Sequence, residues 1–232
     1  MSAVIGRQLG DAPLLAALGG CVLVLLAIGT ALTGRVLLAR LGEPDDGAEQ
    51  GKLPYAALAT PRFAVAVGGC SAAALLVLTS RAPPAFWPLW LPLATLGVLL
   101  GCIDAATTWL PLRLTRPLWV LTAVGAAGTV LAAGWRVGVR ALLGALLCFA
   151  FWWLIWRFVG GLGFGDVRLA PVLGATAAAG GWGVLVWAML LGTFAGAAFG
   201  LYRTLRGRRG AFAYGPALLI GQFAALIWPG LG

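Results

Sequence analysis

The stretch LAPVLGATAAAGGWGVLVWAMLLGTFAGAAFGL, residues 169–201, decides the fold of this chain. It holds no charged residue, and its 33 residues are too many for one ordinary membrane span, because a transmembrane helix needs about 20. Its middle reads Gly180-Gly181-Trp182-Gly183, and glycine is a poor helix former. The stretch therefore predicts a short helix, a tight turn and a second helix.

Six further apolar windows have the length of a membrane span. The chain is 61% hydrophobic and 10% charged, whereas soluble domains average about 25% charged residues. Together with the split stretch, these windows predict an all-α polytopic membrane protein with about eight transmembrane helices, one of them short. The windows lie near residues 14–34, 63–80, 86–104, 117–134, 141–159 and 212–229.

Eight spans also give a consistent orientation in the membrane. Lys and Arg prefer cytoplasmic loops, and with the N-terminus outside, twelve of the sixteen basic residues fall in cytoplasmic segments. Merging 169–201 into one span would place the cluster from Arg203 to Arg209 outside. We therefore expect a multi-pass protein of the plasma (inner) membrane that contacts the lipid bilayer. The basic residues form no continuous patch, so no nucleic-acid partner is expected.

The acidic residues indicate where chemistry could occur. Of seven in the chain, only Asp104 and Asp166 follow Glu49, and each stands where a long apolar stretch ends. A carboxylate at the bilayer centre costs roughly 3 kcal/mol on insertion scales. The predicted topology places Asp104 at the cytoplasmic end of the third span and Asp166 in the turn between the fifth and sixth. Two carboxyl groups that share a proton can supply an acid and a base for hydrolysis.

Composition excludes most other hydrolase mechanisms, because histidine is the usual base of Ser-His and Cys-His systems and the usual metal ligand. The chain has no histidine, and its four cysteines stand singly without C-x-x-C spacing. We therefore expect buried thiols and neither a metal site nor a cofactor. Asp104 could instead be a structural helix-end residue paired with Arg113 or Arg116. A proton-coupled transporter using both aspartates, or a non-catalytic scaffold, also stays open at this point.

Three motifs around these aspartates resemble the type IV prepilin peptidases, which are G-x-G-D intramembrane aspartic proteases. Residues 163–169 read GFGDVRL, with Arg168 in place of the usual Lys and Gly174 following. Residues 110–117 read LPLRLTRP, similar to the family's L-P-x-x-L-T-x-P, and Tyr214-Gly215-Pro216 is similar to its F-G-P-F. The motifs occur in the family's order across roughly residues 86–230.

This resemblance implies an intramembrane aspartic endopeptidase. The family removes basic leader peptides from type IV prepilins or pseudopilins, cutting after a glycine at the cytoplasmic membrane face. By resemblance the catalytic aspartates are Asp104 and Asp166. The other motif residues would bind substrate or shape the site, and they are Gly163, Gly165, Arg168, Pro111, Gly215 and Pro216.

The resemblance also divides the chain in two. We expect residues 1–62 to form the first transmembrane helix and a short cytoplasmic loop, and residues 63–232 to form the transmembrane aspartic peptidase domain. Bifunctional members carry paired C-x-x-C motifs in this loop, but residues 35–62 contain no cysteine. We therefore expect a peptidase without N-methyltransferase activity. The acidic run from Glu43 to Glu49 is either a solvated loop or a lure for a basic substrate, and the oligomeric state is left open.

Overall fold

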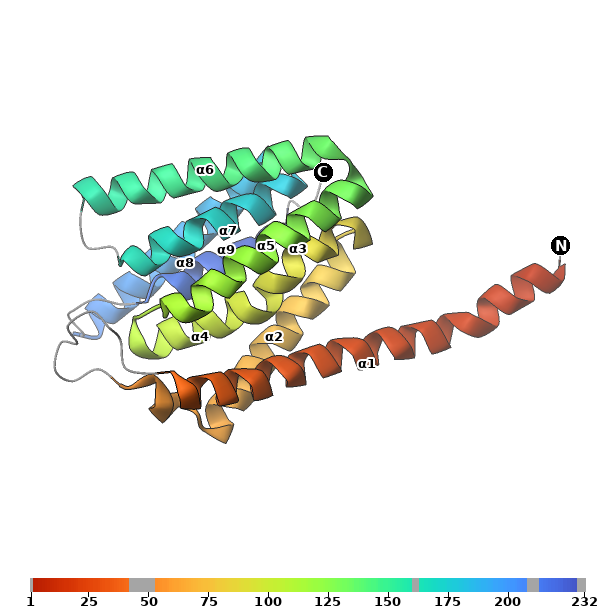
Figure 1. Ribbon diagram of the computed structural model, residues 1–232, viewed down its shortest axis with the longest axis horizontal. Helices are drawn as coiled ribbons and strands as arrows, with labels where there is room; N and C mark the ends of the chain where they lie inside the picture. Colours follow the sequence, from red (N-terminus) through yellow and green to blue (C-terminus); the bar gives the residue numbers. More distant parts are fainter. Residues whose placement is uncertain (1, 42–52, 160–162, 208–212, 229–232) are drawn as a thin grey trace.

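The computed structural model describes residues 2–41, 53–159, 163–207 and 213–228. Within these ranges every regular element is helical, and the helices form one bundle from which the N-terminal part of the first helix projects (Figure 1). Two short 3-10 turns, η1 (Tyr55–Leu58) and η2 (Pro84–Phe86), and a π-helical turn, η3 (Leu93–Gly97), connect them. The α-helices are α1 (Ser2–Arg40), α2 (Pro61–Arg81), α3 (Trp87–Pro92), α4 (Val98–Thr107), α5 (Leu112–Ala133), α6 (Trp135–Phe158), α7 (Phe164–Gly180), α8 (Trp182–Leu205) and α9 (Gly215–Ile227).

The split of residues 169–201 into two helices is confirmed. Helix α7 has 17 residues and ends at Gly180, and helix α8 begins two residues later at Trp182. Gly181 joins them with a φ of 135°. Side chains with a Cβ rarely adopt that conformation, whereas glycine does so freely. The turn therefore falls on the glycines that the sequence indicated.

The predicted all-α polytopic membrane fold is confirmed as well. Among the described residues, 6 helical stretches are long and apolar enough to cross a membrane, and α9 is a shorter apolar helix. Large apolar side chains cover the outside of the bundle, for example Leu142, Leu146 and Phe151 on α6. Such a surface suits lipid, which solvates apolar side chains as well as a protein core does. The long stretches are Gly19–Arg40, Pro61–Arg81, Pro84–Thr107, Leu112–Ala133, Trp135–Phe158 and Trp182–Leu205.

The expectation of buried cysteines is wrong for two of the four. Cys21 on α1 and Cys70 on α2 are exposed on the bundle surface, while Cys102 is partly covered and Cys148 is buried. A thiol behaves as a small apolar group. An apolar sequence environment therefore does not distinguish a cysteine in the core from one that faces lipid.

Glycines allow the helices that carry the site to pack closely. A Cβ at Gly144 of α6 or at Gly174 of α7 would collide with the backbone of the other helix. Gly221 of α9 is pressed against the backbone of α8 at Gly192 in the same way. Small residues at such crossings let helix backbones approach within a membrane. These contacts hold α7 against α6 and α9 against α8.

Residues 53–60, which precede the second membrane helix, pack against the bundle. Helix α1 continues to Arg40, and after the undescribed residues 42–52 the chain turns through η1. Tyr55 and Leu58 of this turn are buried, and Arg35 Nε donates a hydrogen bond to the carbonyl oxygen of Ala59 at 3.2 Å. Part of the predicted cytoplasmic loop thus packs into the bundle, because its Tyr-Ala-Ala-Leu turn is apolar. The acidic run from Glu43 to Glu49 lies outside the described residues.

Candidate active site

Asp104 lies near the end of α4, one turn before the helix stops. Thr108 terminates the helix in the left-handed conformation, with a φ of 60°, and its N–H donates to the Asp104 carbonyl oxygen at 2.7 Å. The Thr107 hydroxyl donates to the carbonyl oxygen of Ile103 at 2.8 Å. The Asp104 side chain is only 4% exposed. The end of α4 therefore holds a buried carboxyl group on a fixed backbone.

The segment that follows Asp104 turns the chain into α5. Pro111 immediately precedes α5 in an extended conformation, with a φ of −67°, which is the value that its ring imposes. Its carbonyl oxygen accepts hydrogen bonds from the N–H groups of Leu114 at 3.0 Å and Thr115 at 3.1 Å, and from the Thr115 hydroxyl at 3.1 Å. The Leu-Pro-x-x-Leu-Thr pattern thus begins a helix, so Pro111 has a structural role here.

Asp166 lies in the first turn of α7, two residues after Phe164, rather than in the turn before the helix. Gly163 precedes the helix in an extended conformation, and its carbonyl oxygen accepts from the Asp166 N–H at 3.1 Å. The first-turn N–H groups of a helix favour a negative charge, which explains why the helix begins early enough to include this residue. The Asp166 side chain is 6% exposed.

The second glycine of the G-x-G-D pattern brings α7 close to the segment after Asp104. A Cβ at Gly165 would lie 3.0 Å from both Cβ and Cδ1 of Leu110, which is tighter than ordinary van der Waals contact. Leu110 stands between α4 and α5, six residues after Asp104. A side chain at residue 165 would therefore push Asp166 away from the end of α4.

Helix α9 supplies the third part of the site. The first N–H groups of a helix have no partner inside it, and that of Gly215 donates to Asp104 Oδ2 at 3.1 Å. Pro216, the next residue, has no N–H, and the Tyr214 carbonyl oxygen accepts from the N–H of Ala217 at 3.1 Å. The Gly-Pro pair thus directs one backbone donor toward the Asp104 carboxyl group.

The two carboxyl groups meet beside Gly215. A Cβ at this glycine would lie 2.8 Å from Asp104 Oδ2 and 3.5 Å from Asp166 Oδ1, so both oxygens border one small space. Among the described residues Asp166 Oδ1 has no hydrogen-bond partner. The N-terminal ends of α7 and α9 both face this space, and helix N-termini favour negative charge. This arrangement can hold two carboxyl groups that share one proton.

The sequence around these residues matches a known family. Residues 89–201 match the model of the type IV leader peptidase family. Through these residues the chain belongs to that family. Both aspartates fall inside the matched segment, whereas Gly215, the residue at which they meet, lies beyond it.

Several curated proteins are similar to the chain. A protein of Burkholderia pseudomallei is 33% identical over 72% of this chain and 54% of its own length. One of Stutzerimonas stutzeri is 33% identical over 59% and 48%, and one of Pseudomonas putida is 30% identical over 72% and 59%. Each is named prepilin leader peptidase/N-methyltransferase. The chain spans about half the length of these relatives, and no solved structure matches it.

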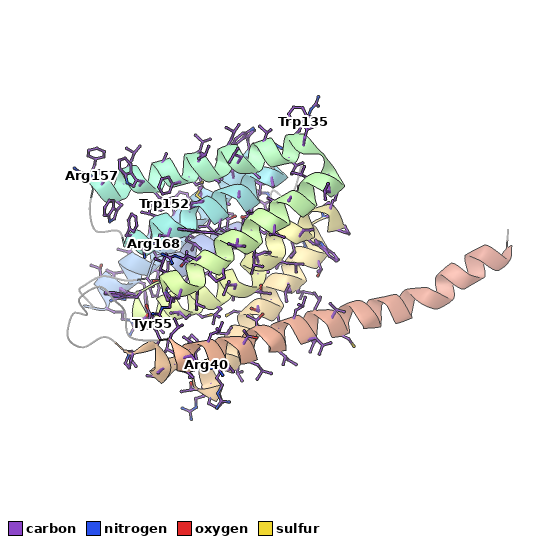
Figure 2. All side chains as sticks on the ribbon, viewed as in Figure 1. Arg40, Tyr55, Trp135, Trp152, Arg157 and Arg168 are labelled. Atoms are coloured by element: carbon purple, nitrogen blue, oxygen red, sulfur yellow. The ribbon has the colours of Figure 1, made fainter. Side chains whose placement is uncertain are left out.

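Arg168 of the leader peptidase motif does not reach the carboxyl groups. Its guanidinium lies over the Phe164 ring, 4.9 Å from the centroid, and its carbonyl oxygen accepts from Trp119 Nε1 at 2.8 Å. Within the described ranges Asp104 makes no ion pair with an arginine. Arg113 and Arg116, which the sequence analysis considered as its partners, therefore do not hold it. Figure 2 shows Arg168 and Arg157 toward one end of the bundle and Trp135 at the other.

Sequence reasoning missed one residue near the pair, Tyr55 of η1. It lies outside the family segment and is 4% exposed. Burial raises the pKa of Tyr55, and the charge of Asp104 raises it further, to about 12. The phenol of Tyr55 therefore lies within electrostatic range of the Asp104 carboxyl group. Nothing in the sequence marked it, because a single tyrosine in a Pro- and Ala-containing turn has no pattern.

Proposed function

We propose that this chain is an intramembrane aspartic endopeptidase that removes the basic leader peptide from type IV prepilins or pseudopilins. The observation that carries this function is the meeting of two buried carboxyl groups, those of Asp104 and Asp166, beside Gly215. The names of the relatives agree with it. Residues 35–62 contain no cysteine, so we propose the peptidase reaction without methyl transfer.

The hydrogen bonds suggest how the two carboxyl groups divide the work. An N–H donor stabilises the ionised form of a carboxyl group, so Asp104, which accepts from Gly215, is the base. Asp166, whose Oδ1 lacks a donor among the described residues, carries the proton. Asp104 takes a proton from water while the water oxygen attacks the scissile carbonyl carbon. Asp166 protonates the carbonyl oxygen, which gives a gem-diol intermediate. When the C–N bond breaks, the protonated Asp104 gives its proton to the leaving nitrogen, and Asp166 takes a proton back from a hydroxyl of the diol, so both carboxyl groups return to their starting states.

The orientation of the substrate follows from charge. The predicted topology puts the end of the bundle that carries Arg157 and Arg168 (Figure 2) at the cytoplasmic face of the inner membrane. A basic leader is held on that side by the same rule that orients the protein. Its hydrophobic helix would lie in the bilayer, so the glycine at the cut would reach the aspartates at the interface.

Cleavage of a model prepilin tests this function. The purified full chain in lipid would receive a peptide with a basic leader, Gly at the cut and a following apolar helix. We expect the wild type to cut after Gly and both Asp104→Asn and Asp166→Asn to lose cutting, because the amide neither accepts nor donates the required proton. Asp11→Asn is the matched control and should cut normally.

The same variants separate the two alternative functions. Cutting at the wild-type rate by either active-site variant would refute the two-aspartate mechanism. If the wild type cuts none of several leaders at any of several pH values on either side of neutral, the peptidase function fails, because a general acid and base work best near their own pKa values. A proton-coupled transporter would then be tested by proton flux in vesicles, which the same substitutions should change.

A further inference from the structure

Tyr55 lies near Asp104 but belongs to none of the three motifs of the sequence analysis. It belongs to η1, the short turn between the first two membrane helices, which packs against α1 and α4. Helix α4 carries Asp104 near its end. Figure 2 shows Tyr55 toward the same end of the bundle as Arg168, which stands two residues after Asp166. The turn therefore borders the side of the site that faces α1.

The Tyr55 hydroxyl is available to bind another molecule. Among the described residues it makes no hydrogen bond, although the residue as a whole is buried. Its oxygen is not one of the enclosed side-chain atoms that lack a partner, so the hydroxyl reaches open space while the ring is covered. Asp166 Oδ1, which lies beside Gly215 together with Asp104 Oδ2, is buried and unpartnered. An accessible donor and an unpartnered carboxyl oxygen near one site suit the binding of a further molecule there.

A group that binds the Tyr55 hydroxyl would accept a hydrogen bond from it. Burial and the charge of Asp104 raise the pKa of Tyr55 to about 12, so the phenol keeps its proton and serves as a donor. A peptide offers carbonyl oxygens as acceptors, and those beside a scissile bond are free because a cleavable segment cannot be helical. The Tyr55 hydroxyl, in a turn that packs against α1 and α4, would meet this extended segment as it enters the site.

We infer that Tyr55 binds the substrate: its hydroxyl donates a hydrogen bond to a backbone carbonyl oxygen of the extended peptide segment next to the scissile bond. This role rests on the proposed peptidase function and adds a specificity determinant from outside the family segment. It is a binding role, because the contact is present before the reaction as well as during it. Losing such a contact raises KM and leaves kcat nearly unchanged.

Kinetics of Tyr55→Phe in the full chain test this role with the model prepilin peptide. The substitution removes one oxygen and keeps the buried ring. We expect KM to rise about three- to tenfold, the range for one hydrogen bond, with kcat and the pH profile unchanged. Tyr202→Phe is the matched control, because Tyr202 is exposed on α8, and it should behave as the wild type. An unchanged KM for Tyr55→Phe would overturn the inference.

A contact measurement does not depend on turnover. A photoreactive benzoylphenylalanine at residue 55, in the Asp166→Asn background, should cross-link to peptide residues beside the glycine at the cut. The same group at residue 202 should not. If residue 55 captures no peptide while the uncut peptide binds, Tyr55 does not touch the substrate. A wild type that cuts while residue 55 captures nothing refutes this inference alone, whereas a wild type that binds but never cuts refutes the peptidase function.

Discussion

Gly215→Ala should disable the site without unfolding the protein. The added Cβ would lie 2.8 Å from Asp104 Oδ2 and 3.5 Å from both Asp104 Cγ and Asp166 Oδ1. Ordinary contact between such atoms begins near 3.4 Å, so the Asp104 carboxyl group must retreat by roughly half an ångström, the tolerance that catalytic groups usually have. The carboxyl group has few ways to move, because it is buried and the Gly215 N–H holds the same oxygen at 3.1 Å.

The expected magnitude follows from that displacement. A misplacement of about 1 Å can cost about 100-fold in rate, so we expect kcat to fall between about 10- and 100-fold. KM should change little, because Gly215 faces the carboxyl groups. A 100-fold loss corresponds to about 2.7 kcal/mol of transition-state stabilisation.

The assay is cleavage of the model prepilin peptide by purified protein in lipid, with kcat and KM measured separately. Gly69→Ala on α2 is the control, since nothing lies within 4 Å of the position of its Cβ, and it should keep wild-type kinetics. Circular dichroism and thermal unfolding would show that both variants fold. A folded Gly215→Ala protein with wild-type kcat would refute the claim that both carboxyl groups work beside this glycine.

Three further predictions concern packing and ionisation. Gly101→Ala should reduce cleavage modestly, because its Cβ would collide with Cδ1 of Leu219, a buried side chain of α9 with little space to turn away. Adding Leu219→Ala should restore part of the rate, and a double variant no better than the single would contradict this packing. Gly174→Ala should lower the free energy of unfolding by about 1–3 kcal/mol, because the backbone of Gly144 cannot move aside. Thermal unfolding in detergent checks this against Gly183→Ala, whose Cβ would meet open space, and equal midpoints would argue against it. The pKa of Tyr55 rises from 10.0 to about 12 on folding. The unfolded chain therefore loses the phenol proton at a lower pH than the folded chain, so the free energy of unfolding should fall as pH rises from 10 to 12. Tyr55→Phe should show less of that fall in alkaline unfolding curves, and an identical fall would mean that Tyr55 titrates normally.

The helices were predictable from sequence because the forces that form them act locally. A run of about 20 apolar residues forms a helix in lipid, since every backbone group must find its partner within the segment. The break at Gly180-Gly181 was readable for the same reason, and Gly181 does adopt a φ of 135°. Local sequence could not show that Cys70 faces outward, because a core and a bilayer favour the same residues.

Sequence also indicated which residues belong together at the site, but not how they meet. Two acidic residues in an apolar chain were conspicuous, and their motifs identified Gly165, Pro111 and Gly215. The sequence placed Asp166 in a turn, whereas the structure places it inside α7. Arg168 belongs to the same motif, yet its guanidinium stacks on Phe164.

The amino-acid sequence by itself determined that this chain is a bundle of membrane helices with two carboxyl groups at helix ends. The tertiary structure alone decided that a backbone N–H of Gly215 holds Asp104, across 111 residues of sequence, and that Tyr55 is buried in a turn without a motif. Hydropathy and helix propensity act over one helix length, and they leave a signal in local composition. Contacts between distant helices depend on which faces pack together. A single glycine or tyrosine that makes such a contact has no recognisable pattern in the sequence around it.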